Sequence, residues 1–219
     1  MKDIKLVIFD LDGLLMDTEK LGLEGWENAF NQIGVKISRE ALMNRIGRNQ
    51  ADVKKTIIEA AEDDFDYEAA REIMRKYIID YANENGMPLK KGVIELLSYL
   101  EKVNIRKCVA TSRGISSAEK YLKMANIYEQ FDYIVTGDMV EKGKPEPDIF
   151  IYASEIFDVK PSECLVLEDS INGVMAGVRA EMKTIMIPDM IPSTKEIEEV
   201  IYSKCDSLLD VIELFKNSL

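Results

Sequence analysis

The fold is decided by residues 6–13, which read LVIFDLDG. Four apolar residues, a pattern typical of a buried strand, precede two aspartates spaced i, i+2 and then a glycine. Because side chains alternate along a strand, Asp10 and Asp12 point the same way, with Cα atoms about 6–7 Å apart. Two carboxylates at the end of a buried strand are costly to desolvate, so they indicate a bound cation, or a pair in which one group is ionised and the other protonated. The pattern therefore predicts a chemical site.

After Pro88 the sequence alternates between strand and helix patterns. With the first strand over residues 4–9, we expect strands over 106–111, 132–135, 163–168 and 183–187, and helices over 92–102, 115–125, 145–157 and 171–180. Strands that alternate with helices indicate a parallel sheet covered on both faces. The sequence therefore predicts an α/β fold with a doubly wound, Rossmann-like parallel sheet.

An all-helical insert interrupts this rhythm after the first strand. Leu23, Trp26 and Phe30 recur at helical spacing, and the helical patterns end at the stop signals of residues 85–88, which read NGMP. We expect Trp26 and Phe30 to lie in the core of the insert. The predicted organisation is a core domain of residues 1–16 and 87–219 with an all-α domain of residues 17–86 inserted in it.

Composition excludes several classes of function. The chain has 219 residues and a formal net charge of −12, with a pI of about 4.7. Such a surface repels nucleic acid and anionic membranes, so neither is expected as a partner. Histidine is absent, which excludes a Ser-His-Asp triad, a histidine general base and a histidine-ligated zinc site.

The cysteines and the N-terminus favour a cytoplasmic protein. Cys108, Cys164 and Cys205 have no metal-ligand spacing, and we expect them to be buried free thiols. The apolar stretch near the N-terminus is interrupted by Asp10 and Asp12, which is not the pattern of a signal peptide. No apolar run approaches the ~20 residues that span a bilayer. We therefore expect a soluble, cytoplasmic protein. A monomer is the default expectation, because the helical insert leaves no obvious unpaired hydrophobic patch.

Polar groups follow several of the predicted strands. In open parallel sheets, ligands bind beyond the carboxyl ends of the strands. The loop with Asp10 and Asp12 lies there, and the other groups expected at this edge are Thr111, Ser112, Arg113, Lys144, Glu168 and Asp169. Acids, hydroxyls and a lysine thus converge on one edge of the predicted sheet.

Four motifs resemble those of the haloacid dehalogenase-like phosphotransferases. They are DLDGLLMDTE at residues 10–19, ATS at 110–112, GKPEPDIF at 143–150 and LEDSINGVMAG at 167–177. The order of the motifs and the insert after the first one are similar to the branch with a helical cap, which includes β-phosphoglucomutase-like proteins and sugar-phosphate phosphatases. The resemblance covers essentially the whole chain and implies that the insert is a cap domain.

The resemblance implies a role for each core residue. Asp10 resembles the nucleophile that forms an aspartyl-phosphate, and Asp12 resembles the general acid/base. Thr111 and the backbone N–H of Ser112 resemble the groups that bind the phosphate oxygens. Lys144 resembles the cation that offsets the charge of the nucleophile and the phosphate.

The resemblance also implies a magnesium ion and substrate contacts. The carboxylates of Asp10, Glu168 and Asp169 with the backbone carbonyl of Asp12 would form an all-oxygen shell, which suits Mg²⁺. The substrate contacts that it suggests are Thr18, Glu19, Arg48 and Arg113. For Thr18 and Glu19 the alternative is a role in capping the first helix of the insert. For Arg48 the alternative is a surface arginine.

The resemblance predicts a Mg²⁺-dependent phosphatase that acts on a small phosphorylated metabolite, such as a sugar, nucleoside or glycolate phosphate. The alternative is a β-phosphoglucomutase-like phosphomutase. Such mutases carry a histidine four residues after the position of Thr18, where this chain has Gly22, so we favour hydrolysis. A non-catalytic binding protein is disfavoured because every chemical position is filled, and a dehalogenase is disfavoured because Asp12 and the acids of the metal site are present.

One position departs from the family pattern without bearing on function. Relatives have glycine at the position of Glu181, where a positive φ ends the helix. Either the turn differs here, or Glu181 accepts strain of about 1 kcal/mol.

Overall fold

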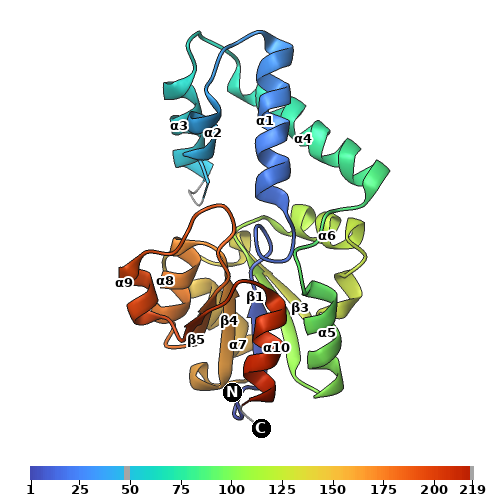
Figure 1. The fold of residues 1–219 in the computed structure, drawn as a ribbon, viewed down its shortest axis with the longest axis vertical. Helices are drawn as coiled ribbons and strands as arrows, with labels where there is room; N and C mark the ends of the chain where they lie inside the picture. The colour runs from blue at the N-terminus through green and yellow to red at the C-terminus, as the bar shows by residue number, and fades with distance from the viewer. Residues whose placement is uncertain (47–49, 218–219) are drawn as a thin grey trace. The chain divides into compact units, whose positions relative to one another are not determined.

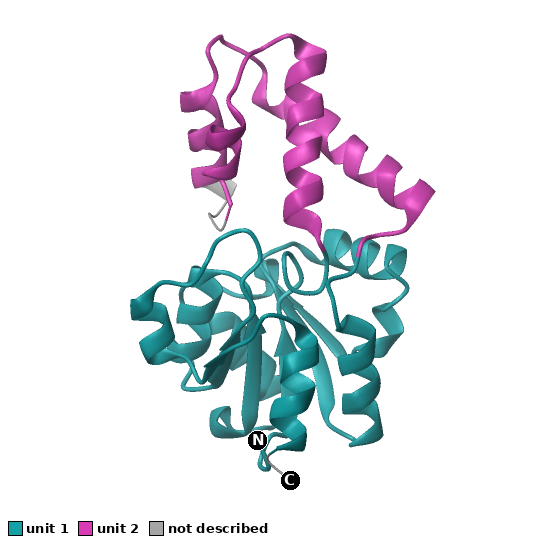
Figure 2. Cartoon of the chain, in the orientation of Figure 1, with its two compact units in different colours: residues 1–16, 89–219 teal, residues 17–88 magenta. Residues whose placement is uncertain are grey.

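The computed structural model describes residues 1–46 and 50–217 of the chain. The chain divides into two compact units, one of residues 1–16 and 89–219 and the other of residues 17–88 (Figure 2). We call the first the core unit and the second the helical unit. The helical unit is therefore an insertion between the first strand of the core unit and the rest of it.

The core unit is built on a six-stranded sheet in which all paired strands are parallel. The central strand pairs on both sides, with Ile8 opposite Cys108 in one neighbour and Val166 in the other. The strands, in the order β3-β2-β1-β4-β5-β6, are β1 Leu6–Phe9, β2 Arg106–Thr111, β3 Tyr133–Thr136, β4 Cys164–Glu168, β5 Lys183–Met186 and β6 Ser203–Lys204. The predicted α/β class with a parallel sheet is thereby confirmed.

Helices cover both faces of this sheet. In Figure 1, α10 lies in front of the sheet and α7 lies behind it. Ile149 and Phe150 of α7 pack with Leu6 and Ile8 of β1 in one buried cluster. The helices of the core unit are α5 Val93–Lys102, α6 Ile115–Met124, α7 Asp148–Ile156, α8 Ile171–Arg179, α9 Lys195–Val200 and α10 Leu208–Lys216.

The helix predicted over residues 145–157 is shorter in the structure. It begins at Asp148, with Pro147 as its N-cap residue. A residue before proline is disfavoured in the α region, so Glu146 cannot continue a helix into Pro147. The segment with Lys144 is therefore an irregular loop, which leads the lysine into the site described below.

The turn at the end of α8 shows which of the two alternatives holds for Glu181. This residue has a φ of 58°, in the left-handed region. The N–H of Met182 donates to the carbonyl of Gly177 at 3.2 Å, and the N–H of Glu181 donates to that of Val178 at 3.0 Å. These two bonds form a Schellman motif, in which glycine is usual at the position of Glu181. Glu181 thus accepts the strain.

Within its described residues, the helical unit contains four helices around an aromatic core. Trp26 and Phe30 are buried, with 2% and 3% exposure. Trp26 stacks near Tyr67 at 5.6 Å between ring centroids, and Phe30 meets Phe65 edge-on at 5.1 Å. The predicted core position of Trp26 and Phe30 is confirmed. The helices are α1 Thr18–Ile33, α2 Arg39–Met43, α3 Gln50–Ala60 and α4 Tyr67–Asn85.

The three cysteines lie in the core unit. Cys108, Cys164 and Cys205 are buried and free, as expected from the sequence.

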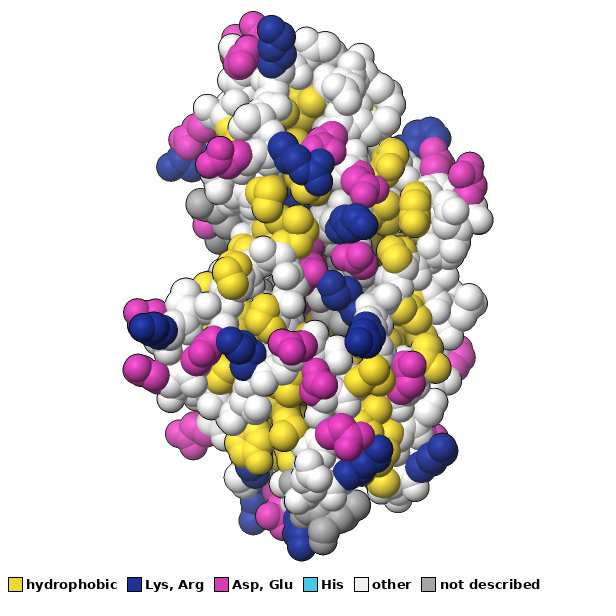
Figure 3. All heavy atoms as spheres, viewed as in Figure 1, with side chains coloured by type: hydrophobic (Ala, Val, Ile, Leu, Met, Phe, Trp, Pro, Cys, Tyr) yellow, Lys and Arg dark blue, Asp and Glu magenta, His cyan; other side chains and the backbone are white. Residues whose placement is uncertain are grey.

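Acidic and basic side chains are interspersed over the face seen in Figure 3. Within the described ranges, every helix is too short or too polar to traverse a lipid bilayer.

Candidate functional site

The carboxyl ends of β1, β2 and β4 bring the predicted residues to one edge of the sheet. Asp10 follows β1 directly, Thr111 is the last residue of β2, and Glu168 is the last residue of β4. The N–H of Asp10 donates to the carbonyl of Leu167 at 3.0 Å, which extends the pairing of β1 with β4 into the site. Side chains that are distant in sequence therefore meet where ligands bind in open parallel sheets.

Lys144 joins two of these strand ends. Its Nζ donates to Oδ1 of Asp10 at 2.5 Å, to Oε1 of Glu168 at 2.6 Å and to the carbonyl of Ala110 at 2.9 Å. An ammonium group has three donors, so all of them are used. Only 6% of the side chain is exposed. Lys144 is therefore buried and fully bonded, although it lies in a loop.

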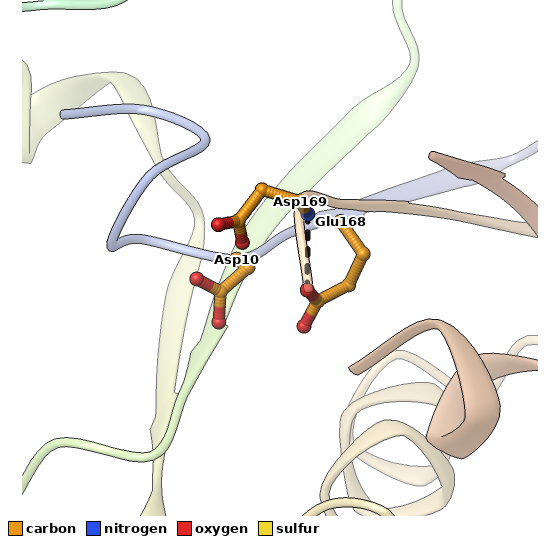
Figure 4. Close-up of side chains that lie close together, drawn as sticks. All are labelled: Asp10, Glu168 and Asp169. Atoms are coloured by element: carbon orange, nitrogen blue, oxygen red, sulfur yellow. Dashed lines mark hydrogen bonds between the residues drawn. The ribbon is translucent and has the colours of Figure 1, made fainter. Parts of the chain in front are cut away.

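Asp10, Glu168 and Asp169 form a carboxylate cluster. One oxygen from each lies within 4.8 Å of the others. Figure 4 shows the three side chains side by side, with Asp10 on the chain after β1 and the other two at the end of β4. We call this set the carboxylate cluster.

Glu168 is held in place from several sides. While Oε1 accepts from Lys144, Oε2 accepts from the N–H groups of Asp169 and Ser170 at 3.1 and 3.2 Å. Gly173 of α8 packs directly against it, since a Cβ on Gly173 would lie 1.8 Å from Oε1 of Glu168. Gly177 likewise packs α8 closely against the sheet, because a Cβ on Gly177 would lie 2.5 Å from Oγ1 of Thr184 in β5.

The electrostatics at this edge depend first on burial and then on the neighbouring charges. Burial raises the pKa of Asp10 to about 7, and Glu168 and Asp12 add to the shift, although Lys144 opposes it. Burial alone would lower the pKa of Lys144, but the carboxylates of Asp10 and Glu168 raise it above its ordinary value. Lys144 is therefore a fixed positive charge, and one ammonium does not balance the cluster.

Asp12 and Arg113 form a second ion pair at the edge. Nε and Nη2 of Arg113 donate to the two carboxylate oxygens of Asp12 at 2.6 and 2.7 Å. The guanidinium lies over the ring of Tyr121 at 4.2 Å, and Nη1 donates to Ser117 at 3.1 Å. Both partners are about three quarters buried. Arg113 was expected to contact substrate. In the structure its guanidinium is paired with the carboxylate of Asp12.

Thr111 and Ser112 lie in the turn between β2 and α6. Thr111 is 1% exposed, and its Oγ1 accepts from the N–H of Arg113 at 3.2 Å. The helix itself begins at Ile115, after Gly114 as the N-cap residue. The turn therefore sets Thr111 beside Lys144, which bonds the preceding carbonyl of Ala110.

The residues at this edge fit a divalent cation. The cluster supplies three carboxylates within 4.8 Å, an all-oxygen donor set of the kind that Mg²⁺ prefers. The second observation is the charge, because Lys144 sets one positive charge against the three carboxylates of the cluster. A dication at the cluster would supply the missing charge.

Three further candidates, Thr18, Glu19 and Arg48, belong to the helical unit. Thr18 is buried in the first turn of α1, and Glu19 accepts a hydrogen bond from Arg45 at 3.0 Å. The N-cap residue of α1 is Asp17, whose side chain makes no capping bond. Arg48 lies outside the described residues.

Sequence reasoning missed an ion pair next to the cluster. Lys90 donates to Oδ1 of Asp189 at 2.5 Å, and Asp189 follows β5. A Cβ on Gly13 would touch both Asp169 and Asp189, which places Asp189 beside the cluster. The signal was present, since Asp189 follows the strand predicted over residues 183–187 at the same edge of the sheet.

Comparison with known proteins identifies the family. Residues 7–187 match the family model described as haloacid dehalogenase-like hydrolase. The chain belongs to the haloacid dehalogenase-like hydrolases. The predicted resemblance, the Rossmann-like core and the expectation of a hydrolase of this family are thereby confirmed.

Individual relatives place the chain near the β-phosphoglucomutase-like branch. It is 30% identical to a phosphorylated carbohydrates phosphatase of Thermotoga maritima, over 83% of this chain and 84% of that protein. It is 31% identical to a β-phosphoglucomutase of Bacillus subtilis, over 79% of this chain and 78% of the other. The crystal structure of CbbY from Rhodobacter sphaeroides in complex with phosphate is similar, with a TM-score of 0.78, 25% identity and 95% and 96% of the two chains covered.

Proposed function

We propose that the protein is a Mg²⁺-dependent phosphatase that hydrolyses a small phosphorylated metabolite through an aspartyl-phosphate on Asp10. The observation that carries the proposal is the bridge from Lys144 to Asp10 and Glu168, with Asp169 alongside. A nucleophilic carboxylate, a fixed cation and a group of metal-binding oxygens then lie within one site. Phosphoryl transfer depends above all on positioning and charge neutralisation, which this arrangement supplies.

In the first step, a carboxylate oxygen of Asp10 attacks phosphorus while the bond from phosphorus to the ester oxygen breaks. Asp12 gives its proton to the departing alcohol, which contributes about 10²–10⁴-fold to the rate. Lys144 offsets the charge that builds on the phosphoryl oxygens, and Thr111 with the N–H of Ser112 binds those oxygens.

In the second step, Asp12 takes a proton from water, the water oxygen attacks phosphorus, and the bond to Asp10 breaks. Inorganic phosphate leaves and both aspartates are restored. The carboxylates of Asp10, Glu168 and Asp169 would hold Mg²⁺, which when bound supplies charge neutralisation and orientation of the phosphoryl group.

Hydrolysis is favoured over the phosphomutase alternative by the residue at position 22, which is glycine in a chain without histidine. A Cβ at this position would lie 3.2 Å from Nη2 of Arg45, whose guanidinium also bonds Glu19. Arg45 thus packs against position 22, where this chain has glycine and mutases of this type carry a histidine. We further propose that Thr18, Glu19 and Arg48 contribute to substrate recognition, which substitutions that change KM more than kcat would support.

Phosphate release from a panel of sugar, nucleotide and glycolate phosphates tests the proposal. The wild-type protein is assayed with Mg²⁺ and with EDTA, beside Asp10→Asn. Hydrolysis that disappears both with EDTA and in the variant is the expected result. Interconversion of β-glucose 1-phosphate and 6-phosphate without phosphate release would favour the mutase, and turnover that persists in Asp10→Asn would contradict the mechanism.

A further inference from the structure

Asp189 is buried beside the carboxylate cluster with one oxygen that lacks a partner. Its side chain is 8% exposed. Oδ1 accepts from Lys90, whereas Oδ2 is buried and has no hydrogen-bond partner within the part of the chain that the structure describes. A buried carboxylate oxygen that is left unpaired costs its full desolvation, so such an oxygen indicates a donor that belongs there.

Gly13 shows where this oxygen points. A Cβ on Gly13 would lie 2.2 Å from Oδ2 of Asp169 and 3.3 Å from Oδ2 of Asp189. Both oxygens therefore border the same small volume, on the side of Asp169 that faces the first loop of the site. Gly13 has a φ of 81° and no side chain, so it leaves that volume open.

Lys90 fixes Asp189 in this position. Its N–H donates to the carbonyl of Leu15 at 3.0 Å, so its backbone is anchored to the loop that also contains Gly13. Its ammonium then holds Oδ1 and leaves Oδ2 turned toward the cluster. An ion pair that only stabilised the fold would not need to bury the second oxygen unpaired beside another carboxylate.

The charged groups at this edge of the sheet carry an excess of negative charge that one divalent cation would neutralise. Five carboxylates stand against three cations, which leaves two negative charges. They are Asp10, Asp12, Glu168, Asp169 and Asp189 on one side and Lys90, Arg113 and Lys144 on the other. Because Lys90 balances Asp189 and Arg113 balances Asp12, the excess lies on Asp10, Glu168 and Asp169, which Lys144 alone offsets. It equals the charge of one Mg²⁺.

We propose that Asp189 is a positioning residue whose Oδ2 accepts a hydrogen bond from a water molecule of the ion held by Asp169. The inference rests on the proposed Mg²⁺ site. Mg²⁺ keeps several of its waters when it binds to protein carboxylates, and those waters are the donors that Oδ2 lacks. Removal of an outer acceptor of this kind weakens metal binding by about 10–100-fold.

Isothermal titration with MgCl₂ in the absence of substrate tests this role. Asp189→Asn should raise the Kd for Mg²⁺ about 10–100-fold. The matched control is Glu163→Gln, which removes the partner of Lys5 in a surface ion pair of the same unit and should leave the Kd unchanged. The Tm of metal-free Asp189→Asn should not fall, because asparagine keeps an acceptor for Lys90 and removes a buried charge.

Each outcome has a separate meaning. If the wild-type protein binds Mg²⁺ and Asp189→Asn binds it equally well, the role of Asp189 is overturned and the metal site stands. If the wild-type protein shows no Mg²⁺ binding, the metal site of the proposed function fails and this role fails with it. Should Asp189→Asn be unfolded, Asp189→Ser is titrated in its place, with the same loss of affinity expected.

Discussion

Asp10 is a buried carboxylate whose charge Lys144 balances only in part. Burial outweighs the attraction of the ammonium, and the pKa of Asp10 rises from 3.8 to about 7. The folded protein therefore binds the proton of Asp10 more tightly than the unfolded chain does. By linkage, this group makes the metal-free protein less stable as the pH rises from 3.8 to about 7, and its full contribution is present only below 3.8.

Asp10→Asn should remove this pH dependence. The free energy of unfolding, measured by urea denaturation in EDTA, should fall less between pH 5 and pH 8 in the variant than in the wild-type protein. Glu155→Gln, which removes an exposed acid from α7, serves as the control and should fall as the wild type does. Equal slopes in the wild type and Asp10→Asn would show that Asp10 titrates normally.

At the residue scale, the sequence indicated individual groups better than their partners. Asp10, Glu168 and Asp169 were predictable because each follows or ends an apolar strand at one edge of a parallel sheet. The bidentate contact of Arg113 with Asp12 joins residues 101 positions apart and depends on side-chain conformation, which no local pattern encodes. Asp189 had the same strand-end signal, but the unpaired oxygen and the bond from Lys90 are properties of the folded chain.

At the element scale, α8 sets the position of Glu168 through a single glycine. Alanine in place of glycine inside a helix usually stabilises by about 0.5–1 kcal/mol. At Gly173 we expect the reverse, because the new Cβ would lie 1.8 Å from Oε1 of Glu168, which Lys144 and two N–H groups hold in place. Gly173→Ala should lower the Tm and reduce kcat/KM at least about 10²-fold, since misplacement by about 1 Å has that effect.

Gly143→Ala is the matched control, because a Cβ there would meet nothing within 4 Å although the residue precedes Lys144. This variant should keep the wild-type Tm and kcat/KM. Gly173→Ala with normal activity and a raised Tm would contradict the account of how α8 holds Glu168.

The turn after α8 carries strain that a glycine would relieve. Glu181 occupies the left-handed region with a φ of 58°, which costs an ordinary residue roughly 1–2 kcal/mol. Glu181→Gly should therefore raise the free energy of unfolding by about 1 kcal/mol in urea denaturation. Glu155→Gly, at an exposed position inside α7, should lower it by about 0.5 kcal/mol. A loss of stability in both variants would mean that the turn is not strained.

Element positions followed from local patterns, but their ends depended on backbone chemistry. The strand over residues 106–111 was predicted with the bounds that β2 has. The helix predicted over 145–157 begins only at Asp148, because Pro145 and Pro147 disfavour helical backbone in the residues before them. The sequence pattern assigned nothing after residue 187, where α9, the two-residue β6 and α10 complete the sheet. Strands this short carry no periodicity of their own, and β6 exists through its pairing with β5.

At the scale of the whole molecule, the fold class followed from the alternation of strands and helices, and the family from four motifs in order. The strand order β3-β2-β1-β4-β5-β6 is what places β1 between β2 and β4, so that the acids after β1 meet those of β4. The choice of substrate does not follow from this arrangement, because the core supplies the phosphoryl chemistry alone.

The proposed mechanism requires that Asp10 becomes phosphorylated during the reaction. Asp12→Asn is mixed with an aryl phosphate, whose leaving group needs no proton, so that the first step proceeds and the second is slowed. The reaction is quenched with acid and the peptides are analysed by mass spectrometry. The mechanism predicts one phosphoryl group on Asp10, absent when Asp10→Asn is added to the variant. Release of the aryl alcohol with no phosphoryl group on the protein, or with the group on another residue, would contradict it.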